Sequence, residues 1–162
     1  MSEENQEKTA QQKAWQATPN MVVTTIADQA LALYSEGRLE RARDLLLKLV
    51  KMRPGSSTFW SLLGVIYRRQ NRPVTALQCL QQAAELDPSN RNALTNLGET
   101  LVMVGKLEEG IEVLSAVFQM GVVKGEPAQA QDMMTKRAGA QLGIIEKIAQ
   151  AAEAGEFDEI GS

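Results

Sequence analysis

Residues 60–67 read WSLLGVIY and hold one of the two tryptophans and one of the two tyrosines of a chain that is only 4% aromatic. Such a cluster marks either a binding surface or a part of the core. Trp60, Leu63, Gly64 and Tyr67 recur at helical spacing and therefore share one face of a helix. Apolar residues on one helical face are usually packed inside, so we expect these four to face the core.

The pattern of this stretch returns at intervals of 34 residues, in the segments 23–56, 57–90 and 91–124. The middle segment continues from W-x2-L-G-x2-Y to Ala76, Leu80, Ala83 and Pro88. The matching positions are Ile26, Ala30, Leu33, Ala42, Leu46, Leu49 and Pro54 in the first segment, and Leu94, Leu97, Gly98, Leu101, Gly110, Leu114 and Val117 in the third. A fixed period of this length predicts a fold built from stacked repeats.

Each segment contains two apolar-periodic stretches of roughly 14 residues, which predicts a pair of helices. The breakers between them are Glu36-Gly37-Arg38, Asn71-Arg72-Pro73 and Val104-Gly105-Lys106. The small residues that would let paired helices approach closely are Ala30, Gly64 and Gly98 on the first helices, and Ala42, Ala76 and Gly110 on the second. Because one hairpin cannot bury its apolar face alone, neighbouring hairpins are expected to stack.

These residues resemble the tetratricopeptide repeat family over about 100 of the 162 positions. The resemblance implies an all-α, right-handed α-solenoid whose first helices line a concave groove. The residues that it places in this peptide-binding groove are Thr24, Ala27, Leu31, Tyr34 and Ser35, then Thr58, Ser61, Val65, Arg68 and Arg69, then Asn92, Thr95, Glu99, Val102 and Met103. An extended protein segment is the partner that this mixed surface is expected to bind. Arg68 and Arg69 are equally well explained as cations at a helix C-terminus.

The segments outside the repeats have different expected roles. Residues 1–20 form a polar N-terminal extension that we expect to be flexible, although Trp15 within it suggests docking onto the domain or a partner. Residues 125–154 are expected to form a capping helix whose stripe contains Met134, Ala138, Leu142, Ile145, Ile148, Ala149 and Ala152. Residues 155–162 are expected to be a flexible tail.

Composition argues against several classes of function. The chain has no histidine and a single cysteine, Cys79, so the usual general base and nucleophile pairs are missing and no enzyme activity, metal site or cofactor is expected. A net charge of −3 and scattered basic residues argue against nucleic acid as a partner. No apolar run reaches the roughly 18 residues of a membrane span, and no signal peptide is visible, so we expect a cytoplasmic protein with no membrane insertion.

A narrower resemblance is to the tetratricopeptide chaperones of type III secretion translocators. Residues 34–42 (YSEGRLERA) resemble that family's Y-x-x-G-[KR]-x-x-x-A opening, and residues 58–64 (TFWSLLG) resemble its aromatic entry to the second repeat. Residues 98–101 (GETL) match its A-E-C-L less well, with Thr100 in place of the cysteine. This resemblance implies a chaperone for an extended apolar client segment, with self-association through the N-terminal region giving a possible homodimer.

The alternative is a general scaffold or adaptor in another bacterial assembly. One known mode of the wider family, the carboxylate clamp for heat-shock protein C-termini, is disfavoured. Ala27 and Leu31 occupy the positions of its Lys and Asn, and Asn92 occupies the position of a third basic residue.

Overall fold

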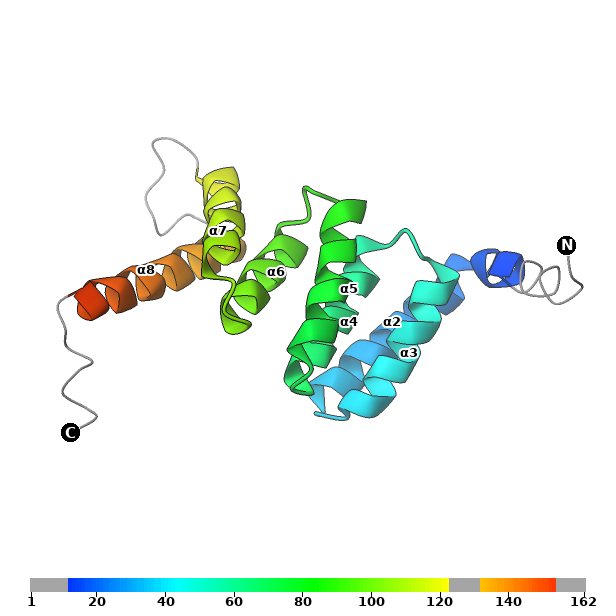
Figure 1. Ribbon diagram of the computed structural model, residues 1–162. Coiled ribbons are helices and arrows are strands. Elements are labelled where there is room, and N and C mark those ends of the chain that lie inside the picture. The colour runs from blue at the N-terminus through cyan, green and yellow to red at the C-terminus, as the bar shows by residue number, and fades with distance from the viewer. Residues whose placement is uncertain (1–11, 123–131, 154–162) are drawn as a thin grey trace, which may run out of the picture. The chain divides into compact units, whose positions relative to one another are not determined.

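The computed structural model describes residues 12–122 and 132–153, and these residues form helices and turns without a strand. After a helical turn at residues 12–16, the described helices are α2 (Asn20–Ser35), α3 (Leu39–Met52), α4 (Ser57–Arg69), α5 (Pro73–Leu86), α6 (Arg91–Met103), α7 (Leu107–Gly121) and α8 (Met133–Glu153) (Figure 1). The prediction of an all-α fold is confirmed for this part of the chain. The expected tail at 155–162 and the expected first turns of the capping helix lie outside the described residues.

The contacts divide the chain into two compact units, Met1–Ala93 and Leu94–Ser162. The first unit contains α2 to α5, and the second contains most of α6 together with α7 and α8. The physical reason is that repeats make contacts only with their neighbours, so no central core joins distant parts of the chain. Each unit is described separately below.

The paired helices are joined by the same left-handed turn each time. Gly37, Asn71 and Gly105 lie 34 residues apart and have φ values of 75°, 57° and 84°. The residue after each turn residue donates its backbone N–H to a carbonyl oxygen in the last turn of the preceding helix, with an N–O distance of 2.9 Å. The three pairs are Arg38 to Leu33, Arg72 to Tyr67 and Lys106 to Leu101. This pattern closes a helix when one residue adopts the left-handed conformation that glycine and asparagine tolerate best.

Small residues allow the helices of a pair to pack very closely. A Cβ added at Gly64 would lie 2.6 Å from Leu80 Cγ and 3.1 Å from the carbonyl oxygen of Ala76. In the second unit, a Cβ at Gly98 would lie 2.7 Å from Leu114 Cγ. The predicted role of the small residues is therefore confirmed, because any larger side chain would push these helices apart.

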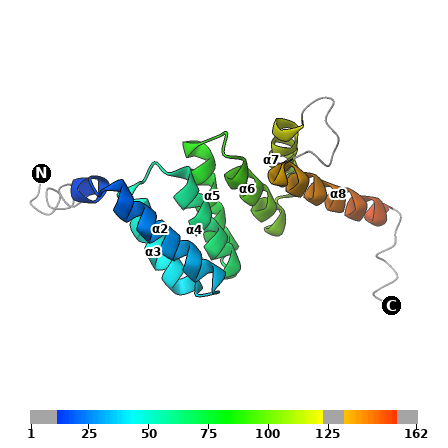
Figure 2. The ribbon, with the colours of Figure 1, turned by 180° about the vertical axis from the view of Figure 1, so that it is seen from behind.

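The opening stretch WSLLGVIY lies in α4 and forms part of the core of the first unit. Leu63, Gly64 and Ile66 are buried, and Trp60 and Tyr67 are half-buried against the same cluster. Trp60 also donates its indole N–H to the carbonyl oxygen of Pro54 at 2.8 Å. The core prediction for this stretch is confirmed. Figure 2 shows α2 running alongside α3 in the same unit.

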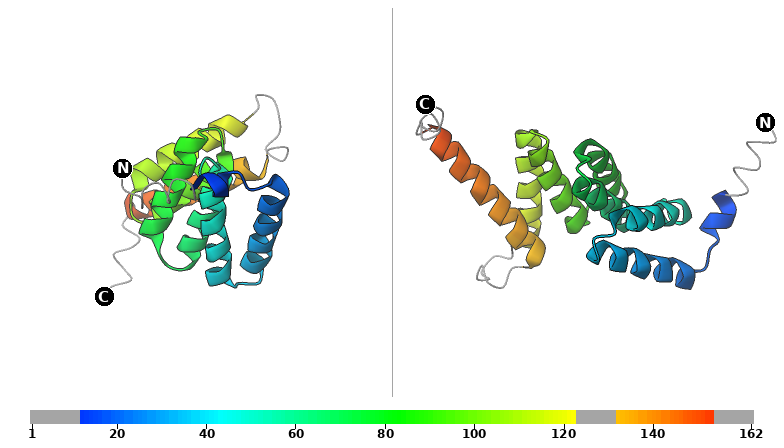
Figure 3. Two further views of the ribbon diagram at one scale, coloured as in Figure 1. Left: turned by 90° about the vertical axis from the view of Figure 1, so that its right-hand side faces the viewer. Right: turned by 90° about the horizontal axis from the view of Figure 1, so that it is seen from below.

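In the second unit, α8 packs against α7 over only part of its length. Ala138 is buried with Leu114 and Val117, and Leu142 and Ile145 pack against this cluster. Ile148 and Ala149, however, are exposed, so the predicted stripe does not pack against α7 at these two positions. The right-hand view of Figure 3 gives the reason, because the two helices cross at an angle and separate toward the end of α8.

The close approach at Gly64 is testable by adding a single methyl group. Gly64→Ala should lower the free energy of unfolding by about 1–3 kcal/mol, because Leu80 and the Ala76 carbonyl cannot both move away. The measurement is urea denaturation followed by circular dichroism.

Gly143→Ala is the matched control, because no atom lies within 4 Å of a Cβ added there on α8. We expect this control to be neutral or to stabilise by up to about 1 kcal/mol. Equal stability of the two variants would contradict the close packing of α4 and α5.

Candidate peptide-binding surface

Two helices of the first unit, α2 and α4, lie next to each other at both ends. Near their beginnings, Val23 and Phe59 line one pocket. Near their ends, the guanidinium carbon of Arg69 lies 4.3 Å from the centre of the Tyr34 ring. Leu31 and Val65 occupy the intervening turns, so predicted groove residues from two repeats share one surface. We call this the α2–α4 face, defined by Leu31, Tyr34, Ser35, Thr58, Val65 and Arg69.

The side chains of the α2–α4 face combine an apolar centre with a cationic end. Leu31 is 44% exposed, so part of its side chain is available for contact with a partner. Val65 and Tyr34 are half-buried, and Ser35, Thr58 and Arg69 are exposed. The Tyr34–Arg69 contact has cation–π geometry and holds both side chains in place. Such a surface can bury an apolar side chain of a partner and orient a neighbouring polar group.

Ser61 and Thr95 do not reach a surface as predicted. They occupy the same position in consecutive repeats and are only 5% and 0% exposed. Both side chains are short and leave almost no surface for a partner to contact. These two residues therefore belong to the interior, and the prediction that they line a groove is wrong.

The remaining predicted groove residues on α6 differ in how much of each side chain is exposed. Val102 packs into the helix pair, since its Cγ2 lies 2.7 Å from where a Cβ at Gly110 would be. Met103 is 58% exposed and Asn92 is also exposed. Within this set, Met103 is the apolar side chain that a partner could reach in the second unit, and its role stays a prediction.

Glu99 forms an ion pair with a residue of α8. The guanidinium group of Arg137 binds both carboxylate oxygens of Glu99, with Nε 2.5 Å from Oε1, and also donates to Asn96 Oδ1 at 2.9 Å. The Glu99 side chain is only 12% exposed, so this ion pair is largely shielded from water. Glu99 is therefore a docking residue for α8 in this structure and not an open groove position.

Sequence reasoning missed Arg137, although a signal for it existed. A fourth 34-residue segment beginning at residue 125 would place Arg137 at its thirteenth position, which the repeat frame assigns to the groove side. The segment lacks the other repeat residues, so the sequence predicts a cap outside the frame. Continuing the register would have identified Arg137 as a groove-side cation facing Glu99.

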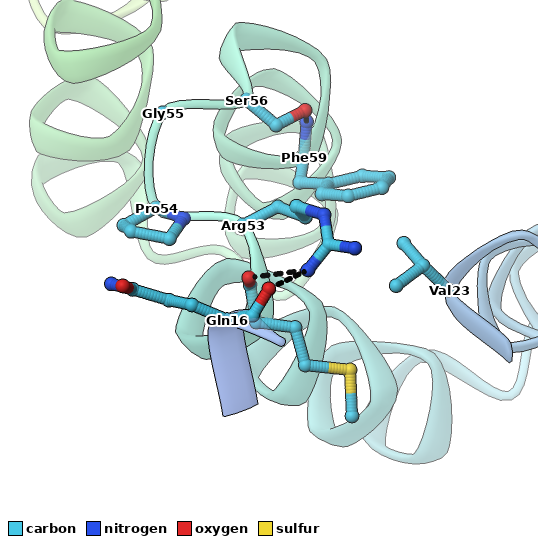
Figure 4. Close-up of a pocket in the computed structure, with 8 residues that line it drawn as sticks. Gln16, Val23, Arg53, Pro54, Gly55, Ser56 and Phe59 are labelled. Atoms are coloured by element: carbon cyan, nitrogen blue, oxygen red, sulfur yellow. Dashed lines mark hydrogen bonds between the residues drawn. The ribbon is translucent and has the colours of Figure 1, made fainter. Parts of the chain in front are cut away.

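The pocket that Val23 and Phe59 line has a volume of about 430 Å³ and lies where the chain enters α2 (Figure 4). Its apolar wall comes from Val23, Met52 and Phe59, and Arg53 crosses it. The guanidinium group of Arg53 donates to the carbonyl oxygens of Gln16 and Thr18, at 2.9 and 2.6 Å, and to the Asn20 side chain at 2.9 Å. Arg53 thus connects residues 16–20 to the first hairpin through hydrogen bonds.

Trp15 lies beside the first hairpin, with Lys51 Nζ 5.9 Å from the centre of its ring. The half-buried state of this side chain agrees with docking onto its own domain, one of the two options that the sequence left open. Residues 12–16 form a helical turn and residues 16, 18 and 20 are hydrogen-bonded to Arg53, while the flexibility of the extension stays a prediction. Residues 1–11 lie outside the described part.

The chemical inventory of the described residues is limited. Burial raises the pKa of the Cys79 thiol to about 11, so it is protonated at neutral pH and behaves as a small apolar residue. In residues 12–122 and 132–153, no three His, Cys, Asp or Glu side chains are grouped to hold a metal ion. None of the helices described has the length and apolar content that a membrane span requires.

Comparison with known proteins identifies the repeat and the fold. Residues 27–90 match the family model described as tetratricopeptide repeat. The fold is similar to the Yersinia enterocolitica type III secretion translocator chaperone SycD, with a TM-score of 0.68 and 17% identity over 78% of this chain and 91% of that one. It is also similar to the Sgt2 TPR domain from Aspergillus fumigatus, with a TM-score of 0.69 and 16% identity over 86% and 85% of the two chains.

Curated relatives match at the level of sequence but are much longer. The chain is 29% identical to a peroxisomal targeting signal receptor of Candida glabrata over 96 residues, which cover 59% of this chain and 16% of that protein. It is 26% identical to a Hordeum vulgare protein described as a probable UDP-N-acetylglucosamine–peptide N-acetylglucosaminyltransferase SPINDLY, covering 70% and 14% of the two chains. The chain therefore spans about one sixth of the length of these relatives or less.

Removing Arg137 tests its contact with Glu99. Arg137→Met should lower the free energy of unfolding by about 2 kcal/mol at pH 7, because the shielded Glu99 carboxylate loses its counter-ion. Adding Glu99→Gln to this variant should recover a large part of the loss, since no buried charge then remains. Lys147→Met on the exposed side of α8 is the control and should change stability by less than about 0.5 kcal/mol.

Hydrogen exchange tests the role of Arg53. The amides of Ala17 and Thr18 donate to the carbonyl oxygens of Lys13 and Trp15. Arg53→Gln should speed exchange at these two amides by about tenfold or more, because the segment loses its anchoring hydrogen bonds. Lys48→Gln on the same hairpin should leave both rates unchanged, and an equal response of the two variants would argue against anchoring by Arg53.

Proposed function

We propose that this chain, which belongs to the tetratricopeptide repeat family over residues 27–90, is a protein-binding module without catalytic activity. Its ligand is an extended segment of another protein, held against the α2–α4 face. The observation that carries this proposal is the exposed Leu31 beside the ordered Tyr34–Arg69 pair, on a surface shared by two successive repeats. An apolar anchor with a fixed polar neighbour is what recognition of an extended peptide requires.

The proposed mechanism is burial of an apolar client residue against Leu31 and Val65. Removing apolar area from water contributes roughly 25 cal/mol per Å², so a client segment with several anchors gains affinity from each side chain that it buries. The same burial shields those anchors from association with other chains. Tyr34 and Arg69 would set the register of the client by accepting it only in one position along the helices.

The finer proposal is a cytoplasmic chaperone of the type III translocator kind. Two observations support it: the local resemblance of residues 34–42 and 58–64 to that family, and the similarity in fold to SycD. A solved complex of SycD contains a peptide of the translocator YopD, and this chain is similar to that structure with a TM-score of 0.69 at 17% identity over 82% and 97% of the two chains. At this identity the likeness supports the fold, and the client class rests on the sequence motifs.

A general scaffold or adaptor is the second candidate, because the fold also occurs outside the translocator chaperones, as in the Sgt2 TPR domain, and so does not by itself select the chaperone role. The two candidates differ in what they do to the partner. A chaperone should raise the soluble fraction of its client when the two are co-expressed, whereas a scaffold should bind a partner that is already stable alone. Sedimentation of the partner with and without this chain distinguishes them.

Leu31 and Val65 are predicted to carry affinity for the partner. In the variant Leu31→Glu/Val65→Glu, the partner would have to bury its anchor against two carboxylates, so capture of partners that co-purify with the native chain should fall by at least about tenfold. Mass spectrometry of the co-purified proteins gives the measurement. Circular dichroism should show unchanged helix content, because Leu31 is exposed and Val65 is half-buried.

The control is Leu47→Glu/Val74→Glu, which changes two exposed apolar residues on the second helices α3 and α5. Capture should persist in this variant. Met103→Glu, made separately, tests the exposed methionine of the second unit. Retention of all partners by Leu31→Glu/Val65→Glu would place the binding surface elsewhere.

A further inference from the structure

One edge of the first unit is rich in arginine although the chain as a whole has a net charge of −3. The turns after α2 and α4 lie at the same end of the unit, as Figure 1 shows and as the 2.8 Å hydrogen bond from Gln70 to Glu40 requires. We call this end the turn edge. Its arginines are Arg38, Arg41, Arg43, Arg68, Arg69 and Arg72, and its carboxylates are Glu36, Glu40 and Asp44. The edge therefore carries an excess of three positive charges.

The carboxylates of the turn edge are already used by two of the arginines. Arg43 binds Glu40 at 2.5 Å and Asp44 at 2.9 Å, and these carboxylates raise the pKa of its guanidinium group further. Arg38 pairs with Glu36 at 3.2 Å. The positive charge that these carboxylates leave in excess includes that of Arg41, Arg69 and Arg72.

Two of those arginines are held in position by aromatic rings. Arg69 lies over Tyr34, and the guanidinium carbon of Arg72 lies 5.0 Å from the centre of the Tyr67 ring. A guanidinium that contacts a ring through its flat face keeps its N–H groups in its own plane, where they can still bind a carboxylate. Stacking also reduces the entropy that such a side chain loses when it binds a ligand.

The turn edge also contains a pocket beside which one hydrogen-bond acceptor has no donor among the described residues. A pocket of about 430 Å³ is lined by residues 37–41 together with Gln70. Gln70 donates its amide N–H to Glu40, but its buried Oε1 accepts no hydrogen bond from the described residues. A buried acceptor without a partner is costly, so a peptide N–H that bonds it after the Gln70 side chain turns toward the pocket would relieve that cost.

We propose that the turn edge binds an acidic stretch of the same protein partner whose apolar anchor lies on the α2–α4 face, an inference that rests on the proposed function of that face. The rise of 1.5 Å per residue places Leu31 about 4.5 Å along α2 from Tyr34, and Val65 about 6 Å along α4 from Arg69. The partner therefore carries its Asp or Glu residues within two or three positions of the anchor. This site differs from a carboxylate clamp, because its cations lie at the turns and not at Ala27, Leu31 or Asn92.

An acidic peptide fits this edge better than a nucleic acid. Glu36, Glu40 and Asp44 are interspersed among the arginines and would oppose a continuous phosphate backbone. A short acidic segment needs only two or three carboxylates placed between them. The overall negative charge of the chain likewise provides no long-range attraction for a polyanion.

The test uses two short fluorescein-labelled peptides that share a pair of leucines, followed by four glutamates in one and four glutamines in the other. Fluorescence anisotropy should show that the glutamate peptide binds about fivefold tighter at roughly 50 mM salt, because two exposed ion pairs contribute up to about 1 kcal/mol. At about 500 mM salt the two affinities should become equal, since the charges are then screened.

Arg41→Gln/Arg72→Gln should remove the preference for the glutamate peptide and leave the glutamine peptide unaffected. Lys48→Gln/Lys147→Gln makes the same change in net charge at exposed positions away from the edge and should keep the preference. An equal loss in both variants, or no binding of the glutamate peptide up to about 1 mM, overturns the proposal. An oligouridylate of similar charge that competes more strongly than the glutamate peptide overturns it in favour of a polyanion site.

The outcomes also separate this inference from the function on which it rests. If only the turn-edge inference fails, the two peptides bind equally and Leu31→Glu/Val65→Glu still abolishes binding of both. If the α2–α4 face itself is not a binding surface, Leu31→Glu/Val65→Glu leaves the glutamine peptide unaffected.

Discussion

The close contact between the two helices of a pair is the constraint on which the rest of each unit depends. At Gly64 the backbone of α4 meets Leu80 and the Ala76 carbonyl of α5, and at Gly98 the backbone of α6 meets Leu114 of α7. Because these helices touch along small residues, their large apolar side chains are directed to the sides of the pair, where they pack on neighbouring elements. Leu63 and Ile66 fill the core of the first unit in this way.

The same packing determines which side chains are left for a partner. Residues on the first helices that neither contact the paired helix nor support its neighbour remain accessible, as Leu31 and Met103 do. The helices end in turns that require a left-handed residue, so the arginines around those turns are brought to one edge of the first unit. Apolar and cationic groups are therefore adjacent for reasons of backbone geometry, before any partner is present.

Much of the fold follows from the sequence because each repeat contains its own signals. The period of 34 residues, the turn residues Gly37, Asn71 and Gly105, and the small residues at the helix contacts are all local and all recur. The surface was harder to predict, because exposure depends on neighbours in space. Ser61 and Thr95 are buried, and Glu99 is paired with Arg137 from a helix outside the three repeats. The division into two units also follows from contact density, which no single repeat reveals.

The left-handed turns have a consequence for how such a chain can change in length. Gly37 and Gly105 have open space around a Cβ, and backbone hydrogen bonds alone close the helices that they follow. A duplication of a whole 34-residue segment would reproduce the turn, the small contact residues and the helix lengths together. Gene duplication could thus lengthen the protein in steps of one hairpin while every junction kept the same local chemistry. A shift of one residue within a hairpin would instead move the glycine away from its contact and rotate the apolar face by about 100°.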